Sequence, residues 1–210
     1  MYRLVIATLG VGLILMTRLG FTHPMGNLGI SHYSALTVGA RAVTVQYVLD
    51  LAEIPSFQEI QRHRITPESG HASVVRYMAG LGDQLVRGLT LKVDEAKLPL
   101  VADRPCTAAF TEGAAGMVTM RVSCRFSANL GERASAFRMH YQDDNFPRRT
   151  GWKEIIVIPG EDAHLISSSA PSTDRSAGLT HYPDSMLTSP PQILSAQSVI
   201  KPKATGFAKK

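Results

Sequence analysis

The sequence predicts a mainly β protein: an antiparallel β-sandwich of about seven strands, with one or two packed helices and an irregular C-terminal tail. Apolar and polar residues alternate with a period of two in many stretches of the first 170 residues, which is typical of strands buried on one face. Two further stretches have features of helices, namely an N-terminal capping pattern and an apolar stripe. Both cysteines fall in neighbouring predicted strands, a position from which one disulfide can join them.

Seven stretches carry the strand pattern. A turn at Gly39-Ala40 separates the first two, and a glycine-containing turn around Ala115 separates the third from the fourth. The sixth contains a continuous apolar run, which indicates a central strand. Strands are therefore expected at residues 28–36, 43–49, 106–110, 118–126, 137–141, 152–158 and 164–168.

Two helices interrupt this series. Ser56 and Glu59 have the spacing of a capping box, in which the hydroxyl and the carboxylate satisfy backbone amides of the first turn, so a short helix is expected from Ser56 to about Arg64. The second helix is expected over residues 71–87, because its apolar residues form one stripe. We expect that stripe to pack against the core of the sandwich. Its members are Val74, Met78, Leu81 and Leu85.

The two cysteines are predicted to form a structural disulfide. A hairpin centred at Ala115 places Cys106 opposite Cys124, and the same register places Ala108 opposite Val122. In a non-hydrogen-bonded antiparallel pair, the two Cα atoms lie about 4.5 Å apart, which is within disulfide range. The sequence has no CxxC motif, so a redox role is not indicated.

The N-terminal 22 residues resemble a secretory signal peptide. Arg3 precedes an apolar run from Leu4 to Met16, which is shorter than the roughly 20 residues of a spanning helix. Cleavage immediately before His23 and cleavage after Gly20 both remain open, and an uncut leader would anchor the domain to the membrane. We expect an exported, periplasmic or otherwise extracytoplasmic protein.

The expected organisation is therefore a signal peptide over residues 1–22, a β-sandwich domain over 23–169 and an extended tail or linker over 170–210. The last segment is assigned as a tail because it is rich in serine and proline.

Composition and motifs exclude several function classes. The chain has 22 Lys and Arg against 17 Asp and Glu, and its scattered basic residues do not predict nucleic-acid binding. No GxSxG motif, helical zinc-protease motif or zinc-finger spacing is present. We therefore expect no enzymatic activity. The alternative is a small exported enzyme in which His140 or His164 meets a nucleophile or a carboxylate in the folded chain.

His23 and His32 are the candidate metal ligands. If cleavage exposes His23, its α-amine and imidazole supply two nitrogens, and His32 supplies a third. Nitrogen ligands of this kind suit Cu(II) or Ni(II). Pro24 has no amide hydrogen, so a deprotonated backbone amide cannot complete the site. The alternative is that His32 is a half-buried strand histidine with a satisfied hydrogen bond.

The densest polar segment, residues 143–154, is a candidate interaction loop. Its acids and arginines balance, so the alternative is a structured loop with internal ion pairs. The residues expected to contact a partner are Asp144, Asn145, Arg149, Trp152 and Glu154.

Three separated blocks also resemble a known family. They are residues 23–34 (HPMGNLGISHYS), 47–59 (YVLDLAEIPSFQE) and 151–155 (GWKEI), followed by shorter matches at 172–175 and 182–183. Together they resemble the extracytoplasmic N-terminal domain that precedes the membrane part of some bacterial high-affinity nickel/cobalt transporters (NicO-like, HupE/UreJ-related).

The resemblance implies an exported domain associated with nickel/cobalt transport, with His23 and His32 at matched positions. The metal ion expected from it is nickel or cobalt (Ni or Co), with copper (Cu) as the second choice, and the expected partner is a membrane transporter. The histidine-rich transmembrane motifs of that family do not occur in these 210 residues, so its permeation residues are not carried over. The alternative function is a non-catalytic structural or interaction module that docks on a membrane partner.

Overall fold

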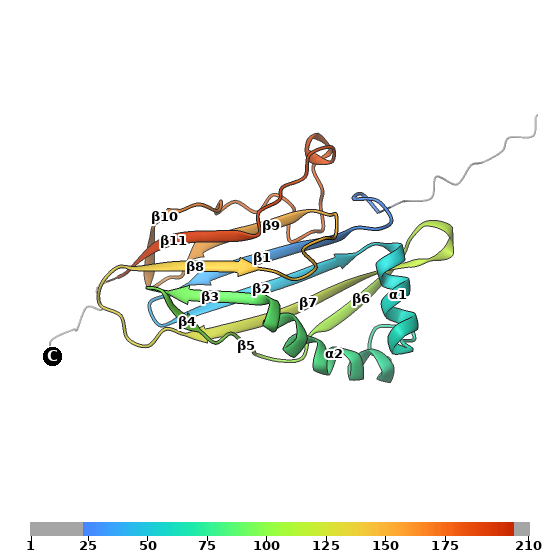
Figure 1. Cartoon of the computed structure of the whole chain (residues 1–210), viewed down its shortest axis with the longest axis horizontal. Coiled ribbons are helices and arrows are strands. Elements are labelled where there is room, and N and C mark those ends of the chain that lie inside the picture. The colour runs from blue at the N-terminus through green and yellow to red at the C-terminus, as the bar shows by residue number, and fades with distance from the viewer. Residues whose placement is uncertain (1–22, 204–210) are drawn as a thin grey trace, which may run out of the picture.

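The structure is a computed structural model that describes residues 23–203. It consists of two β-sheets packed face to face, with two helices at one end (Figure 1). The predicted signal peptide, residues 1–22, lies outside the described residues. The strands are β1 (Ile30–Val38), β2 (Ala42–Leu51), β3 (Leu89–Val93), β4 (Ala96–Leu98), β5 (Val101–Ala102), β6 (Thr107–Glu112), β7 (Val118–Asn129), β8 (Phe137–Asp143), β9 (Lys153–Pro159), β10 (Ala163–Ser168) and β11 (Ser195–Pro202). The helices are α1 (Glu53–His63) and α2 (Ala72–Leu85), with short 3-10 turns η1 (Val86–Gly88), η2 (Ala114–Gly116) and η3 (Asp184–Met186).

The predicted β-sandwich is confirmed. The first sheet has the order β5-β7-β2-β1-β9, with β6 also paired to β7, and the second has the order β10-β11-β8-β3-β4. Paired strands are antiparallel except β1 and β9, which run parallel. The described residues form eleven strands rather than about seven, because β4 and β5 are too short to show a period-two pattern and β3 and β11 were not recognised.

The core lies between the two sheets. Alternation along each strand points one set of side chains inward, such as Leu36 and Phe126 from the first sheet and Leu91 and Tyr141 from the second. Helix α2 covers one end of this core with its predicted apolar stripe, all four members of which are buried. The stripe therefore packs as expected.

Helix α1 begins earlier than the capping box predicts. Its first residue is Glu53, and the cap residue, Ala52, makes no side-chain capping bond. Ser56 lies inside the helix and donates its hydroxyl to the carbonyl of Leu51. Pro55 explains the shift, because proline fits the first turn of a helix, where its missing amide hydrogen costs nothing. The Ser56 capping box is thus not formed.

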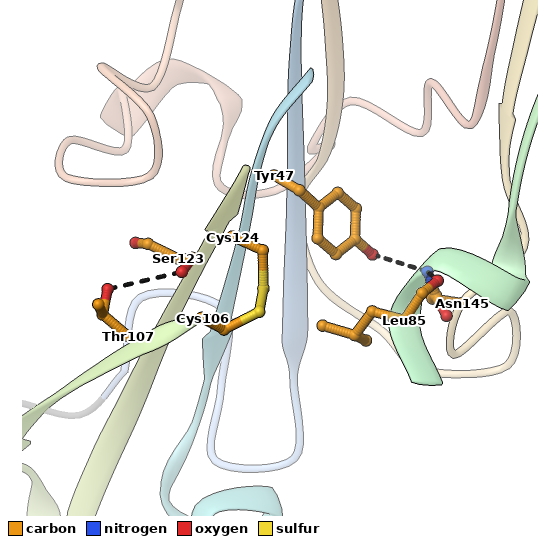
Figure 2. Close-up of a disulfide and its surroundings, with 7 residues drawn as sticks. All are labelled: Tyr47, Leu85, Cys106, Thr107, Ser123, Cys124 and Asn145. Atoms are coloured by element: carbon orange, nitrogen blue, oxygen red, sulfur yellow. Dashed lines mark hydrogen bonds between the residues drawn. A yellow bond between two sulfur atoms is a disulfide. The ribbon is translucent and has the colours of Figure 1, made fainter. Parts of the chain in front are cut away.

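The disulfide forms in the predicted register. Cys106 and Cys124 are joined with their Cα atoms 4.4 Å apart, and Ala108 pairs with Val122. Tyr47 of β2 pairs with Cys124 of β7, so the disulfide lies beside the Tyr47 ring on the inner side of the first sheet (Figure 2). Disulfides persist in oxidising compartments, so this bond indicates an extracytoplasmic setting.

The structure contradicts the predicted tail (residues 170–210) within its described part, residues 170–203. Residues 195–202 form β11, which lies between β10 and β8 inside the second sheet. Its alternate residues Ala196, Ser198 and Ile200 are buried, a strand pattern that the neighbouring prolines and serines obscured. The second sheet is therefore incomplete without this segment, and the domain extends beyond the predicted boundary at residue 169.

Residues 171–187 cover the outer face of the first sheet. Trp152 and Tyr33 from this face form a second apolar cluster with Leu179 of the covering segment. Arg121 of β7 donates to the backbone carbonyls of Gly178 and Leu179, which fixes the segment over the sheet. The first sheet is thus buried on both faces in this region.

We predict that Cys124→Ser lowers the melting temperature by about 6–12 °C. The disulfide spans 18 residues of sequence, and closing a loop of this size contributes about 3 kcal/mol in the chain-entropy model. Thermal unfolding of the variant and of the reduced wild-type protein gives the comparison. Both should show the same drop, and reductant should not lower the variant further. An unchanged melting temperature would contradict a stabilising role.

We also predict that a chain ending at residue 169 does not fold cooperatively, whereas one ending at residue 203 does. The shorter chain lacks β11, so β8 and β10 lose their shared neighbour, and it lacks the cover over Trp152. Denaturant unfolding followed by circular dichroism measures this difference. Cooperative unfolding of the shorter chain would restore the tail interpretation.

Candidate functional site

A histidine–aspartate pair lies between the two sheets near the helical end. The period of β1 turns His32 toward the second sheet, where Asp143 ends β8. His32 Nδ1 and Asp143 Oδ2 are 2.9 Å apart, and both side chains are 2% exposed. The pair therefore joins one sheet to the other at a position that is buried from solvent.

Three donors converge on the Asp143 carboxylate. Tyr47 donates its hydroxyl to Oδ2 over 3.0 Å, and the backbone amide of Asn145 donates to Oδ1 over 2.9 Å. Since the carboxylate accepts, His32 donates from Nδ1, and in neutral imidazole the other nitrogen then carries the lone pair. The carboxylate thereby sets both the tautomer and the orientation of the ring.

His32 Nε2 is buried and has no hydrogen-bond partner among residues 23–203. The ring packs edge-to-face against Phe146, with ring centroids 5.9 Å apart. Phe146 is 37% exposed and has a φ of 44°, a left-handed conformation that is unusual for a bulky residue. Phe146 also lines a cavity of about 230 Å³ beside the helices. One residue with a strained backbone thus contacts both the unpartnered imidazole and the cavity.

The cavity has an apolar floor and a polar rim. The rim groups on α1 and α2 contact one another: Tyr77 donates its hydroxyl to Glu59 over 2.6 Å, and His63 Nε2 lies 3.4 Å from the same carboxylate. The His63 and Tyr77 rings pack with centroids 4.5 Å apart. The floor consists of Leu49, Leu51, Leu81, Leu85, Met120 and Val122.

Glu53 is a second buried acid with an unpartnered oxygen. Its side chain lies under the β6–β7 turn, where Oε1 accepts from the amide of Ala114 over 3.0 Å. Oε2 has no partner among the described residues. The Gly113 backbone packs directly on this carboxylate, and a Cβ there would lie 2.8 Å from Oε1. A side chain at position 113 would therefore have to displace the Glu53 side chain from under the turn.

His23 lies on the opposite face of the first sheet from His32. Its Nε2 is 2.9 Å from Asp50 Oδ2, and its Nδ1 accepts from the amide of Met25 over 3.3 Å. Tyr182 of the covering segment donates to the same Asp50 oxygen over 2.6 Å. Both ring nitrogens of His23 are therefore engaged in fixing the start of the domain.

The structure thus does not bring the two predicted metal ligands together. Asp50 pairs with Ser31, one residue before His32, and neighbouring residues on a strand face opposite sides. Residues 23–203 contain no group of three His, Cys, Asp or Glu side chains placed to hold a metal ion. The alternative interpretation of His32 is right that it is a strand histidine with a hydrogen bond, at Nδ1, but the residue is buried rather than half-buried and its Nε2 has no partner among residues 23–203.

The five residues of the candidate interaction loop occupy different environments. Trp152 and Glu154 are fully buried, and the indole donates to the Glu154 carboxylate over 2.8 Å. Asn145 is half-buried and donates to the Tyr47 hydroxyl and the Leu85 carbonyl. Asp144 is exposed, and Arg149 donates to Gln58 of α1. A partner at this loop would therefore touch Asp144 and Arg149, and not Trp152 or Glu154.

Sequence reasoning missed the residues that define this site. Asp143 and Phe146 are in the polar segment, but nothing local showed that they meet a histidine more than 100 residues away. One usable signal was the period of β8, which turns Asp143 to the same face as the buried Met139 and Tyr141. An acid on an apolar face needs a donor, and His32 is on the apolar face of β1.

No protein-family model matches this chain, and no curated protein sequence is significantly similar to it. No helix within residues 23–203 has both the length and the apolar character required to span a membrane.

We predict that Asp143→Asn destabilises the protein by about 3 kcal/mol, because an amide nitrogen would face donors that now meet a carboxylate. Asp144→Asn is the matched control, since Asp144 is exposed, and it should change stability by less than about 0.5 kcal/mol. Urea unfolding of both variants tests this. Equal effects would show that the buried acid has no special role.

A second prediction concerns alkaline pH. Burial, together with neighbouring acids, raises the pKa of five tyrosines above the ordinary value: Tyr33, Tyr47, Tyr77, Tyr141 and Tyr182. The folded state therefore retains phenol protons that the unfolded state loses above about pH 10, so this contribution is complete below that pH and is lost as the pH rises. Phenolate absorbance should appear together with unfolding. Ionisation of these tyrosines in a protein that stays folded near pH 10 would contradict the prediction.

Proposed function

We propose that this chain is an exported, non-catalytic domain associated with nickel/cobalt transport or handling, and that His32 Nε2 is the nitrogen that contacts the metal ion. Copper is the second choice of metal. The ion is cargo that the domain receives and passes on, and not a resident cofactor. In this proposal residues 1–22 are the signal peptide that directs export.

The observation that supports the proposal most strongly is the state of the His32 ring. Histidines that bind metals commonly donate their other ring nitrogen to a carboxylate, which fixes the tautomer and makes the free nitrogen a better ligand. Asp143 holds His32 in this way, and Nε2 is buried without a partner. Neutral imidazole nitrogen suits Ni(II), Co(II) and Cu(II).

The blocks of the family resemblance lie together in the fold, which also supports the proposal. His32 of the first block pairs with Leu49 of the second and with Lys153 of the third, across three adjacent strands. The two shorter matches lie in the covering segment, where Asp174 and Tyr182 bond to the same strands. Residues far apart in sequence thus form one continuous region.

A site with His32 as its one protein ligand suits passing a metal ion on better than storing it. One imidazole binds a divalent ion weakly, so water or groups of a membrane transport partner would complete the coordination. Phe146 packs on the ring and is partly exposed, so its movement is the step that would give an ion access to Nε2.

The test is titration of metal-free protein with Ni(II), Co(II) and Cu(II). We expect one equivalent to bind to the wild-type protein, and we expect binding to be lost in His32→Asn. His181→Asn is the matched control, because His181 is exposed and lies in the covering segment, and it should bind as the wild type does. Circular dichroism checks that each variant is folded.

Phe146→Ala provides a second test that leaves the His32–Asp143 pair in place. Removing the ring should speed metal association, because it opens the approach to Nε2. Binding that is unchanged in His32→Asn, or absent from both the wild type and Phe146→Ala, would contradict the proposal.

A second candidate function is docking on a membrane partner, and it is favoured by apolar side chains at the same end. Leu28, Phe57 and Phe146 are 60%, 50% and 37% exposed. Backbone and side-chain bonds join their three segments: Ile54 to Asn27, and Arg149 to Gln58.

Replacing Leu28, Phe57 and Phe146 together by serine should release the protein, once its leader has been cleaved, from the membrane fraction of the producing cells. His32→Asn should have no such effect. Retention of the triple variant would argue against docking through this end.

A further inference from the structure

The outward face of the second sheet carries a groove that is separate from the His32 site. The groove has a volume of about 600 Å³ and crosses β3, β8, β11 and the end of β10, which lie side by side in Figure 1. This volume is in the range of sites for small molecules. Its lining is Lys92, Glu95, Arg138, Met139, His140, Ser167, Ser168, Ser169, Gln197, Ser198 and Val199.

Strand pairing arranges the polar lining as a row of donors. His140 of β8 is directly opposite Lys92 of β3 on one side and Gln197 of β11 on the other. Neighbouring strands lie about 4.8 Å apart, so these three side chains form a line across the sheet. Arg138 is two residues from His140 on the same face, about 6.8 Å along the strand.

The two permanent cations of the groove have no acidic partner of their own. No ion pair within 4.0 Å involves Lys92 or Arg138 in the part of the chain that the structure describes. Asp94 is nearby but is occupied, because its carboxylate accepts from the Arg133 guanidinium and from the backbone amide of Arg138. Glu95 lines the groove from a left-handed turn position, with a φ of 69°.

We propose that this groove binds a small organic anion that carries two or more carboxylates. Cations that lie several ångströms apart suit separate negative groups on one molecule, whereas a single tetrahedral anion needs donors that converge on one point. Lys92 and Arg138 would each take one carboxylate. The hydroxyls of Ser167 and Ser169 and the amide of Gln197 would bond the remaining oxygens.

The first test uses citrate as the probe, with acetate and inorganic phosphate for comparison, on metal-free wild-type protein at low salt. Isothermal titration should show citrate binding more tightly than either comparison anion. Citrate affinity should fall as salt is added, because the groove is open to solvent. No binding at millimolar citrate, or equal binding of all three anions, would overturn the proposal.

Charge variants identify the residues that bind the probe. Lys92→Ala with Arg138→Ala should lower citrate affinity by at least about tenfold, since two charge-assisted contacts are lost. The matched control is Lys201→Ala with Lys203→Ala, which removes the same charge from exposed residues that do not line the groove. An equal loss in both double variants would mean non-specific attraction and would overturn the site.

Glu95→Gln is expected to act in the opposite direction. It removes the one acid of the lining, so citrate affinity should rise about two- to threefold. A gain in affinity cannot be caused by a weakened fold. Thermal unfolding of every variant will check that the sheet is intact. Unchanged or weaker binding by Glu95→Gln would contradict an electrostatic site.

Discussion

The buried carboxylate of Asp143 is the constraint on which the arrangement of the two sheets depends. An ionised acid without solvent requires donors, and a deficit of even one is costly. Here the donors come from β1, from β2 and from the loop after β8, so the carboxylate is satisfied only when the sheets meet in one register. The inner face of a sandwich made only of apolar side chains would tolerate sliding, because apolar packing is less directional. The acid at this end therefore specifies how the layers align, and it orients the imidazole as a consequence.

On the outer face of the first sheet, too, acidic side chains hold separate segments together. Asp50, Glu154 and Asp174 each accept hydrogen bonds that join the strands or the start of the domain to the covering segment. That segment is poor in apolar residues and would not pack by hydrophobic burial alone. Its polar composition is therefore compatible with an ordered position, because Asp50 and Glu154 of the sheet accept from its hydroxyls and amides, and its own Asp174 accepts from Tyr33. The same polar composition is typical of a linker, which is why the sequence predicted one here.

Features that depend on residues close together in the sequence were predicted, and contacts between residues far apart in the sequence were not. The fold class, the α2 stripe and the Cys106–Cys124 register depend on periods and on one tight turn, and they were predictable. Strand β11 was missed because it follows a stretch rich in serine and proline, which is typical of a linker. The His32–Asp143 pair was missed because it joins residues whose contact exists only after the sheets pack. The start of α1 differs from the prediction because Pro55 fits the first turn of a helix, which places Ser56 inside the helix and not at its cap.

The position of β11 has a consequence for the order in which the molecule is made. A chain that emerges from its N-terminus presents β8 and β10 long before β11, and until then these two strands have exposed edges and no common neighbour. The second sheet can close only after residue 202 has emerged, so completion of the fold must follow synthesis of residues 23–202. Such late, long-range pairing slows folding. Until it is complete, two nascent chains can pair edge to edge. A binding protein that shields these edges would act in this interval.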